Sequence, residues 1–295
     1  MADYIISAES TADLSKEYFE ERNISYVFFH YELDGKQYPD DLGQTMSFKY
    51  FYDAMRNGAD TKTSQLSMGE FIEYFEPMLK EGKDIIHLSL SSGISGVVNS
   101  ARLAQEELTE KYPDRKLYVI DSLAASSGYG LLMDKLADLR DEGMGIDELA
   151  AWTDEHKLEL NHWFFTTDLK YLIRGGRVSK TAGVVGGLLN ICPLLNVDQE
   201  GKLIGRYKVR GKSKVTQKMW EKMQELAKDG TGYSEKCFIS SSDCYEDAKA
   251  VSDLIEAGMP NLNGKVKHFS IGTTIGSHTG PGTVALFFWG KKRED

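Results

Sequence analysis

Residues 84–96 read DIIHLSLSSGISG, and this stretch decides the fold. Residues 84–90 are mostly apolar, and a short apolar run between turn signals is typical of a strand buried in a parallel sheet. The run passes directly into a loop of small and hydroxyl residues, and a helical pattern follows from about Gly96. A strand, a loop and a helix in this order predict one strand–helix unit of a parallel α/β sheet.

The same alternation continues on both sides of this unit. Further strand patterns lie at residues 4–7, 24–29 and 118–120, and helical patterns lie before Arg22, at 48–55, at 69–80 and after Gly128. Residues 32–41 read as a polar excursion between these elements. Strands that alternate with helices predict a mostly parallel sheet covered on both faces. We therefore expect an N-terminal α/β domain over residues 1–160.

The pattern changes after Asn161. Strand signals occur at residues 163–166, 203–209, 236–240, 266–271 and 283–289, and helical patterns lie near 213–227 and 245–258. Fewer regular alternations and more turns predict a second domain of the α+β class over residues 161–295. The predicted fold is therefore α/β with two domains and a boundary near residue 160.

Composition narrows the class of protein. The chain has 295 residues, 41% of them hydrophobic, which suffices for one large domain or for two ordinary domains, each with its own core. Its 45 acidic and 35 basic residues give a formal net charge of −10, which disfavours nucleic-acid binding. The three cysteines are widely spaced and form no CxxC pair, so we expect a reducing, cytoplasmic location and no structural zinc. The six histidines lack HxH and HExxH spacing, so no metal site is expected.

No segment of the sequence resembles a signal peptide or a membrane span. The stretch MADYIISAEST carries an acid at its third residue and has only a short apolar run. The longest apolar tract, residues 182–197, is broken by glycines, Asn190 and Pro193, and it is shorter than the roughly 20 residues that span a bilayer. We therefore expect no stable membrane insertion.

Four loops are rich in small and hydroxyl residues, at 61–65, 91–96, 121–128 and 276–282. The second and third follow predicted strands and precede helices, which is where parallel sheets bind ligands. In the second loop, a helix that starts near Gly96 offers unpaired N–H groups, and Gly93 and Gly96 allow close approach of the backbone. Ser95 either caps this helix or donates its hydroxyl to a ligand. The loop predicts a site for a carboxylate or a phosphate.

Signatures of nucleotide binding and of ester hydrolysis are absent. The sequence has no GxxxxGK[ST], and residues 183–187 do not form a GxGxxG after a strand. Residues 93–97 read GISGV, where a nucleophile elbow needs GxSxG. A serine hydrolase with Ser95 as nucleophile and His278 as base stays an alternative, although no acid is evident that would orient the base. His278 is otherwise either a solvated loop residue or a hydrogen-bond donor to an anion.

Two basic features stand out against the acidic background. Arg206, Lys208, Arg210, Lys212 and Lys214 alternate along a predicted strand, which would place them on one face. This face is either a solvated edge or a docking surface for an acidic protein partner. Residues 174–177 read RGGR, a basic turn whose paired glycines permit backbone geometry that other residues resist.

Taken together, these segments resemble the DegV family of bacterial fatty-acid-binding proteins. The matching stretches occur in family order and cover nearly the whole chain: STADL at 10–14, TSQ at 63–65, SSGISG at 91–96, DS at 121–122, YLIRGGR at 171–177, GLLNI at 187–191, PLL at 193–195 and HTGPG at 278–282. The chain departs from the family pattern at Ala8-Glu9, where Thr-Asp is usual, and at Val97-Val98, where Thr and an aromatic residue are typical.

The resemblance implies a binding protein rather than an enzyme, with one long-chain fatty acid in a buried tunnel and no other cofactor. The family residues that hold the carboxylate at the domain junction correspond to Thr63, Ser95 and His278, and the backbone of Gly96 is a further candidate contact. Burying about 14 methylenes at ~0.8 kcal/mol each would contribute on the order of 11 kcal/mol, so the tail would supply most of the affinity. Candidates for lining the tunnel are residues 183–195 and the aromatic side chains Phe28, Phe29, Phe164 and Phe165.

The resemblance also implies a protein partner. Family members present the fatty-acid carboxylate to an ATP-dependent fatty-acid kinase subunit, which makes acyl phosphate for phospholipid synthesis. The arginine implicated in that contact corresponds to Arg174. The basic strand adds Arg206 and Arg210 as candidate partner contacts.

Overall fold

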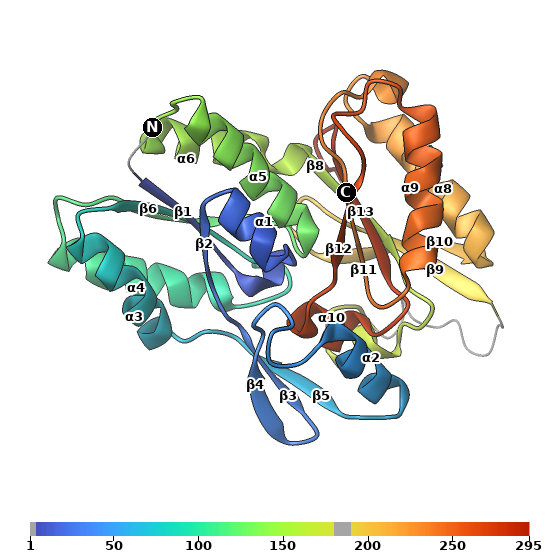
Figure 1. Ribbon diagram of the computed structural model, residues 1–295, viewed down its shortest axis with the longest axis horizontal. Helices are drawn as coiled ribbons and strands as arrows, with labels where there is room; N and C mark the ends of the chain where they lie inside the picture. Colours follow the sequence, from blue (N-terminus) through green and yellow to red (C-terminus); the bar gives the residue numbers. More distant parts are fainter. Residues whose placement is uncertain (1–3, 180–189, 295) are drawn as a thin grey trace.

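The strand predicted at residues 84–90 is β6 (Asp84–Ser89), an inner strand of a four-stranded parallel sheet. The structure is a computed structural model that describes residues 4–179 and 190–294 (Figure 1). The strand order is β2-β1-β6-β7, where β1 is Tyr4–Glu9, β2 is Ile24–Val27 and β7 is Leu117–Asp121. The parallel sheet predicted for the N-terminal part is therefore confirmed.

Helices cover both faces of this sheet. In Figure 1, α3 (Met68–Lys80) and α4 (Val97–Lys111) lie on one side, and α1 (Lys16–Glu21), α5 (Ser127–Asp141) and α6 (Ile146–His156) lie on the other. Helix α3 shows why these segments fold locally: Ser67 and Glu70 form a capping box, and Phe71, Phe75 and Leu79 bury one stripe.

A small antiparallel sheet of order β4-β3-β5 hangs below the first sheet in Figure 1. Its strands are β3 (His30–Leu33), β4 (Lys36–Pro39) and β5 (Thr61–Ser64), and α2 (Phe48–Arg56) packs near it. The interpretation of residues 32–41 as a polar excursion and of 61–65 as a loop was therefore wrong. The sequence does not predict these strands, because most of their side chains face solvent and show no apolar alternation.

The C-terminal part forms a six-stranded mixed sheet of order β10-β9-β8-β13-β11-β12. Its strands are β8 (Leu160–Phe165), β9 (Ile191–Val197), β10 (Leu203–Arg210), β11 (Phe238–Ser241), β12 (Lys267–Ser270) and β13 (Val284–Trp289). Helices α8 (Lys212–Leu226) and α9 (Tyr245–Gly258) cover one face (Figure 1). Two short helices, α7 (Lys170–Arg174) and α10 (Thr273–Thr279), lie beside the small sheet, and 3-10 turns occupy Ser10–Ala12, Lys157–Glu159 and Gly230–Gly232.

The basic residues at 206–214 do not form one alternating face. Strand β10 ends at Arg210, so Lys212 and Lys214 belong to α8. The pairing of β10 with β9 shifts register between Gly205 and Tyr207, and an irregularity of this kind re-aims side chains. Arg206 is half-buried and donates from Nε to Asn196 Oδ1 at 2.8 Å, whereas Arg210 is exposed.

Helix α5 packs between the two large sheets. It contacts β1 of the parallel sheet and also β8, β11 and β13 of the mixed sheet, so it is buried almost all round. Two glycines allow this double approach. A Cβ at Gly128 would lie 2.1 Å from Nε2 of His162, and one at Gly130 would lie 2.8 Å from Leu14. No other residue would leave the helix in this position.

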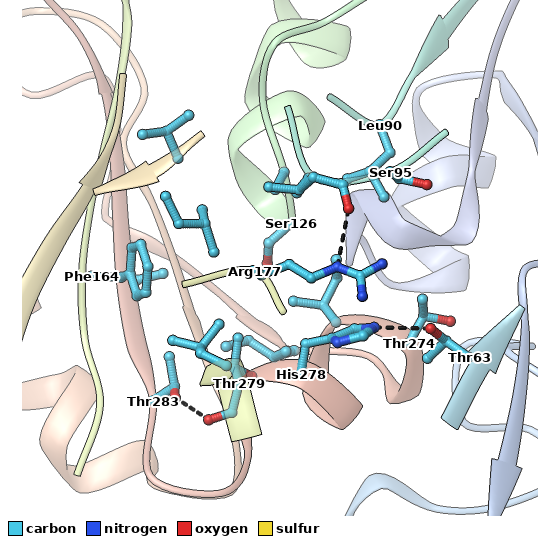
Figure 2. Close-up of a pocket in the computed structure, with 18 of the residues that line it drawn as sticks. Thr63, Leu90, Ser95, Ser126, Phe164, Arg177, Thr274, His278, Thr279 and Thr283 are labelled. Carbon is cyan, nitrogen blue, oxygen red and sulfur yellow. Dashed lines mark hydrogen bonds between the residues drawn. The ribbon is translucent and has the colours of Figure 1, made fainter. Parts of the chain in front are cut away.

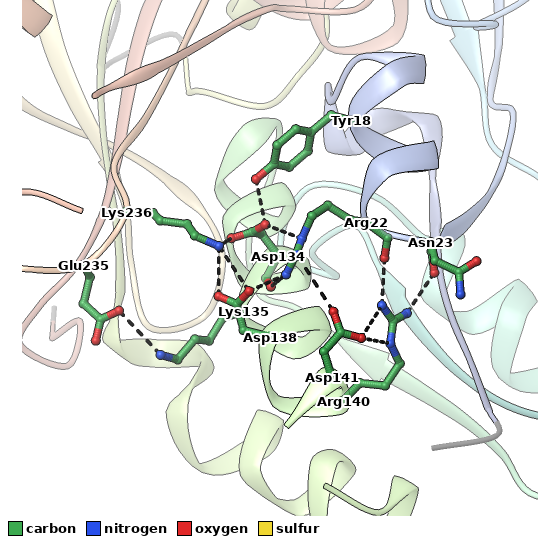
Figure 3. A network of polar contacts seen from close by, with 10 residues as sticks. All are labelled: Tyr18, Arg22, Asn23, Asp134, Lys135, Asp138, Arg140, Asp141, Glu235 and Lys236. Atoms are coloured by element: carbon green, nitrogen blue, oxygen red, sulfur yellow. Dashed lines mark hydrogen bonds and ion pairs between the residues drawn. The ribbon is translucent and has the colours of Figure 1, made fainter. Parts of the chain in front are cut away.

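A charged network joins α1, α5 and the segment before β11 (Figure 3). Asp134 on α5 is 1% exposed and lies 2.8 Å from Nε of Arg22 and 2.6 Å from Nζ of Lys236. Tyr18 donates its hydroxyl to Asp134 at 2.7 Å, and Asp138 contacts both cations. The network therefore links the first helix of the chain to the mixed sheet.

The predicted domain boundary near residue 160 coincides with the start of β8 at Leu160, the first strand of the mixed sheet along the chain. The exact boundary stays a prediction, because α5 precedes it and packs on both sheets. Within residues 4–179 and 190–294, no helix combines the length and the apolar character needed to cross a membrane.

Candidate functional site

The site lies at the edge of the parallel sheet where the order of successive strands reverses. The chain runs from β1 outward to β2 and then returns to β6 on the other side of β1, so the carboxyl ends of β1 and β6 form a topological switch point. The loop after β6 opens onto a cavity of about 380 Å³ (Figure 2), a volume within the range of small-ligand pockets. Its described lining is mostly apolar and comes from the small sheet, from the mixed sheet and from segments that follow strands of the parallel sheet: Phe29, Thr63, Ser64, Gln65, Leu90, Ile94, Ser95, Ala125, Ser126, His162, Phe164, Leu172, Arg177, Val197, Leu203, Ile271, Thr274, Ile275, His278, Thr279, Thr283, Ala285 and Phe287.

The mixed sheet supplies one wall of the cavity. Ala285 and Phe287 of β13, and Thr283 directly before it, are alternate residues. Alternate residues of a strand point to one face. Phe164 of β8 pairs directly opposite Ala285, so it shares that face. Among the aromatic candidates, Phe29 and Phe164 line the cavity, whereas Phe28 and Phe165 do not. Residues 183–189 of the other candidate stretch lie outside the described residues.

Thr63 and His278 meet at the other side of the cavity, across from Phe164 in Figure 2. Thr63 Oγ1 and His278 Nε2 are 2.9 Å apart, although the residues are 215 positions apart in sequence. Thr63 lies in β5 and His278 near the end of α10, and the two elements pack together. The expectation of a loop around His278 was wrong. The segment forms a short helix although its glycines and β-branched residues have low helix propensity.

The imidazole of His278 is held neutral. Burial, with the positive charges of Arg177 and Arg174, lowers the pKa of His278 to about 4. Its Nδ1 atom is buried and has no hydrogen-bond partner among the described residues. A group in this state cannot attract an anion by charge, but its Nε2 can donate a hydrogen bond.

The RGGR turn packs directly against this imidazole. A Cβ at Gly175 would lie 2.3 Å from His278 Nδ1, so only glycine leaves the ring in place. Gly176 has a φ of +71°, in the left-handed region that glycine adopts without strain. The two glycines therefore serve different purposes, close approach and backbone geometry.

Ser95 lies on the loop after β6 and lines the same cavity. Its hydroxyl oxygen accepts a hydrogen bond from Val97 N–H at 3.2 Å, at the start of α4. This bond uses an oxygen lone pair, so the hydroxyl hydrogen stays available to a ligand. The N-cap of α4 is Gly96 and not Ser95, so the Ser95 hydroxyl contacts the start of the helix and can still bind a ligand. Gly96 is the N-cap of α4 and does not belong to the cavity lining, so a ligand contact from its backbone stays a prediction.

Buried carboxylates position the elements that carry these side chains. Glu9 is fully buried and accepts from Ser89 Oγ at 2.7 Å and Leu90 N–H at 3.0 Å, which fixes the start of the Ser95 loop. Asp13 accepts from Gly272 N–H at 2.8 Å, and Asp40 accepts from Thr273 Oγ1 at 2.8 Å, at the beginning of α10. Burial raises the pKa of both aspartates. Sequence reasoning missed these supports because their partners are distant in the chain.

The candidate partner residues lie apart from one another. Arg174 is 44% exposed and pairs with Asp60 at 3.1 Å, beside a surface groove that also reaches Thr63 and His278. Arg206 and Arg210 lie on β10 of the mixed sheet. The structure therefore brings Thr63, Ser95 and His278 to one cavity, with Arg174 just outside it.

Sequence reasoning also missed Arg177, which lines the cavity and the surface groove. The available signal was the second arginine of the RGGR turn, at the end of a segment already singled out for its shape. Within the described ranges 4–179 and 190–294, no three His, Cys, Asp or Glu side chains gather in a way that could hold a metal ion.

Comparisons with known proteins show what this chain is similar to. The family model described as "Uncharacterised protein, DegV family" matches residues 4–291. A DegV domain-containing protein of Clostridium perfringens is 38% identical over 295 residues and covers 100% of both chains. Among solved structures, a DegV lipid binding protein of Thermotoga maritima has a TM-score of 0.83 at 28% identity, with 100% of both chains covered.

A fatty-acid-binding DegV family protein of Thermus thermophilus has a TM-score of 0.86 at 25% identity. The match covers 98% of this chain and 100% of that one. Family match, sequence identity and fold extend over essentially the whole chain. The chain therefore belongs to the DegV family.

Proposed function

We propose that this protein binds one long-chain fatty acid in the cavity, with its carboxylate at Thr63, Ser95 and His278, and presents it to an ATP-dependent fatty-acid kinase subunit. The observation that carries the proposal is the distribution of polar and apolar side chains along the walls of the cavity. Thr63, Ser95 and His278 bring two hydroxyls and an imidazole together, while Phe164, Ala285 and Phe287 give the wall of the mixed sheet an apolar surface beside Thr283. An acyl chain with one polar end matches this division. The solved lipid- and fatty-acid-binding relatives at 28% and 25% identity support the same ligand class.

The proton on His278 decides how the head group would be held. When Nε2 carries the proton, it donates to Thr63 Oγ1, and the hydroxyl hydrogen of Thr63 stays available to the carboxylate. The hydroxyl of Ser95 would supply a second donor, because its own oxygen already accepts from Val97 N–H. Two hydroxyl donors then orient one carboxylate, and the tail supplies most of the affinity.

The geometry favours binding over ester hydrolysis. A serine nucleophile needs a base within hydrogen-bond reach, but His278 Nε2 is bonded to Thr63. No described acid orients Nδ1 of His278, which has no partner among residues 4–179 and 190–294. Turnover of a chromogenic acyl ester that disappears in Ser95→Ala would favour the hydrolase instead.

Removal of either hydroxyl should weaken fatty-acid binding and leave the apolar wall of the cavity unchanged. For Ser95→Ala and for Thr63→Val, we expect a loss of roughly 10- to 100-fold in oleate affinity, since a hydrogen bond to a charged group contributes about 1.5–3 kcal/mol. Titration calorimetry on delipidated protein measures the change. Ser92→Ala is the matched control, because Ser92 is exposed on the same loop and does not line the cavity.

Native mass spectrometry of the purified protein tests the proposal as a whole. We expect an adduct with the mass of a long-chain fatty acid. Protein that has never been delipidated, carries no such adduct and takes up no added oleate would contradict fatty-acid binding.

Presentation to a kinase is tested by charge reversal on the surface. Arg174→Glu and Arg210→Glu should slow acyl-phosphate formation by the kinase subunit about tenfold at low salt, with a smaller difference at high salt, since exposed charges act mainly on association. Retention of the lipid should be unchanged for Arg210→Glu. Lys80→Glu on α3 controls for total charge. Equal rates for wild type and all three variants would contradict docking through these arginines.

A further inference from the structure

The turn between β9 and β10 connects the wall of the cavity to the loop that holds Ser95. Residues 198–202 form a tight turn, in which Oδ1 of Asp198 accepts hydrogen bonds from two main-chain N–H groups at 2.9 Å each. Val197 and Leu203 flank this turn, pair with each other across the two strands and line the cavity. A braced turn therefore carries part of the cavity wall, and its tip lies against the Ser95 loop.

Two glycines bring this turn into direct contact with the loop. A Cβ at Gly93 would lie 2.5 Å from the carbonyl carbon and oxygen of Gly201, and a Cβ at Gly201 would lie 2.0 Å from Oγ of Ser91. Gly201 also has a φ of +74°, in the left-handed region that glycine adopts without strain. A side chain at either position would push the turn away from the loop, so the contact depends on both glycines.

Ser91 joins the two segments through its hydroxyl. Its Oγ donates to the carbonyl of Gly201 at 2.9 Å and accepts from Gly93 N–H at 3.0 Å. The carbonyl of Ser91 accepts from Ser95 N–H at 3.1 Å, so the side chain of Ser91 contacts the turn while its backbone contacts Ser95. Ser91 is 0% exposed and is not among the described residues that line the cavity, so its hydroxyl acts within the protein.

We propose that Ser91 is a positioning residue for Ser95: by tying the loop to the turn between β9 and β10, it holds the Ser95 hydroxyl where the ligand carboxylate binds. This inference rests on the proposed fatty-acid binding and adds the contact that fixes one of its two hydroxyl donors. A donor contributes its full hydrogen bond only when neighbouring groups lock its position. The strength of the Ser95 hydrogen bond should therefore depend on the mixed sheet, to which β9 and β10 belong.

A double-mutant cycle tests whether Ser91 acts through Ser95. Oleate affinity is measured by titration calorimetry for wild type, Ser91→Ala, Ser95→Ala and the double variant. Ser95→Ala should lower the affinity about 10- to 100-fold in wild type but only about threefold or less when Ser91 is already alanine, since the Ser95 hydroxyl is then no longer held in place. Ser92→Ala is the matched control, because Ser92 is exposed on the same loop, and in that background Ser95→Ala should keep its full effect.

The same cycle with Gly201→Ala approaches the contact from the turn, and it decides the question if Ser91→Ala does not fold. The new methyl group displaces the turn from Ser91, so Ser95→Ala should again lose most of its effect. Gly264→Ala controls for backbone strain, because Gly264 has a φ of +77° and open space around the added methyl group. A purely structural role for Ser91 would lower stability and leave the factor for Ser95→Ala unchanged. An unchanged factor in the Ser91→Ala or the Gly201→Ala background overturns the inference.

Hydrogen exchange separates this inference from the proposed function. In protein without ligand, loss of the Ser91 hydroxyl should speed exchange at Ser95 N–H by about tenfold or more, while Ser92→Ala should leave the exchange rate unchanged. Unchanged exchange in Ser91→Ala overturns the inference even if the protein binds fatty acid. Ser95→Ala without effect on oleate affinity in the wild-type background, or wild-type protein that takes up no oleate, contradicts the proposed function instead.

Discussion

Asp134→Asn is expected to lower the free energy of unfolding by about 3–5 kcal/mol, because it leaves two cations without their buried partner. Asp134 is 1% exposed, while Arg22 and Lys236 are 17% and 24% exposed, so solvent cannot replace the lost charge fully. The amide keeps the shape of the side chain but can accept through one oxygen only. Asp138 remains near both cations and keeps the expected loss toward the lower end of the range.

Denaturant unfolding measures this change as a shift of the midpoint at constant slope. Asp141→Asn is the matched control on the same helix, because Asp141 is 49% exposed and an exposed ion pair contributes at most about 1 kcal/mol. Lys236→Gln combined with Asp134→Asn should recover part of the loss, since the second change removes one of the stranded charges. A destabilisation by Asp134→Asn no larger than that of Asp141→Asn would show that the network does not stabilise the fold.

This network also matters for the ligand site. Arg22 follows α1 beside the parallel sheet and Lys236 precedes β11 of the mixed sheet, while the lining of the cavity comes from both parts of the chain. Fixing α5 between the sheets therefore fixes the distance between the Ser95 loop and the wall that carries Phe164. None of the network residues lines the cavity, so Asp134→Asn should affect fatty-acid binding only through the position of α5.

Local patterns in the sequence predict much of this fold. The run at 84–90 and the loop behind it predict β6, α4 and the ligand side of the sheet, because a buried parallel strand and a helix start have strong local signals. The small sheet has no such signal. Strand β4 exposes most of its side chains, and its stability comes from pairing with β3 rather than from its own apolar pattern.

The sequence indicates the residues of the candidate site but not their arrangement. Thr63, Ser95 and His278 were identified from loop chemistry and family resemblance, and the structure gathers them from β5, the loop after β6 and α10. Their mutual distances depend on partners far along the chain, such as Gly175 against His278. That Arg177 also lines the cavity is visible only in the folded chain.

Ala285→Phe is expected to reduce the affinity for C16 and C18 fatty acids by about 100-fold or more. Ala285 is 6% exposed, lies on the cavity face of β13 and pairs opposite Phe164, which lies across the cavity from Thr63 in Figure 2. A phenyl ring there would occupy space that the far end of a long tail needs. Loss of about four buried methylenes at ~0.8 kcal/mol each amounts to roughly 3 kcal/mol, or about 200-fold in affinity.

A chain-length series separates this effect from general damage. Acids shorter by about four carbons should bind Ala285→Phe as they bind wild type, because their tails end before the new ring. Phe164→Ala is the reciprocal variant, and it should move the preferred length upward by opening the same wall. Titration calorimetry with saturated acids of increasing length gives both preferences. If Ala285→Phe weakens short and long acids by the same factor, the tail does not run along β13, and the wall at Phe164 belongs to the protein core rather than to the ligand site.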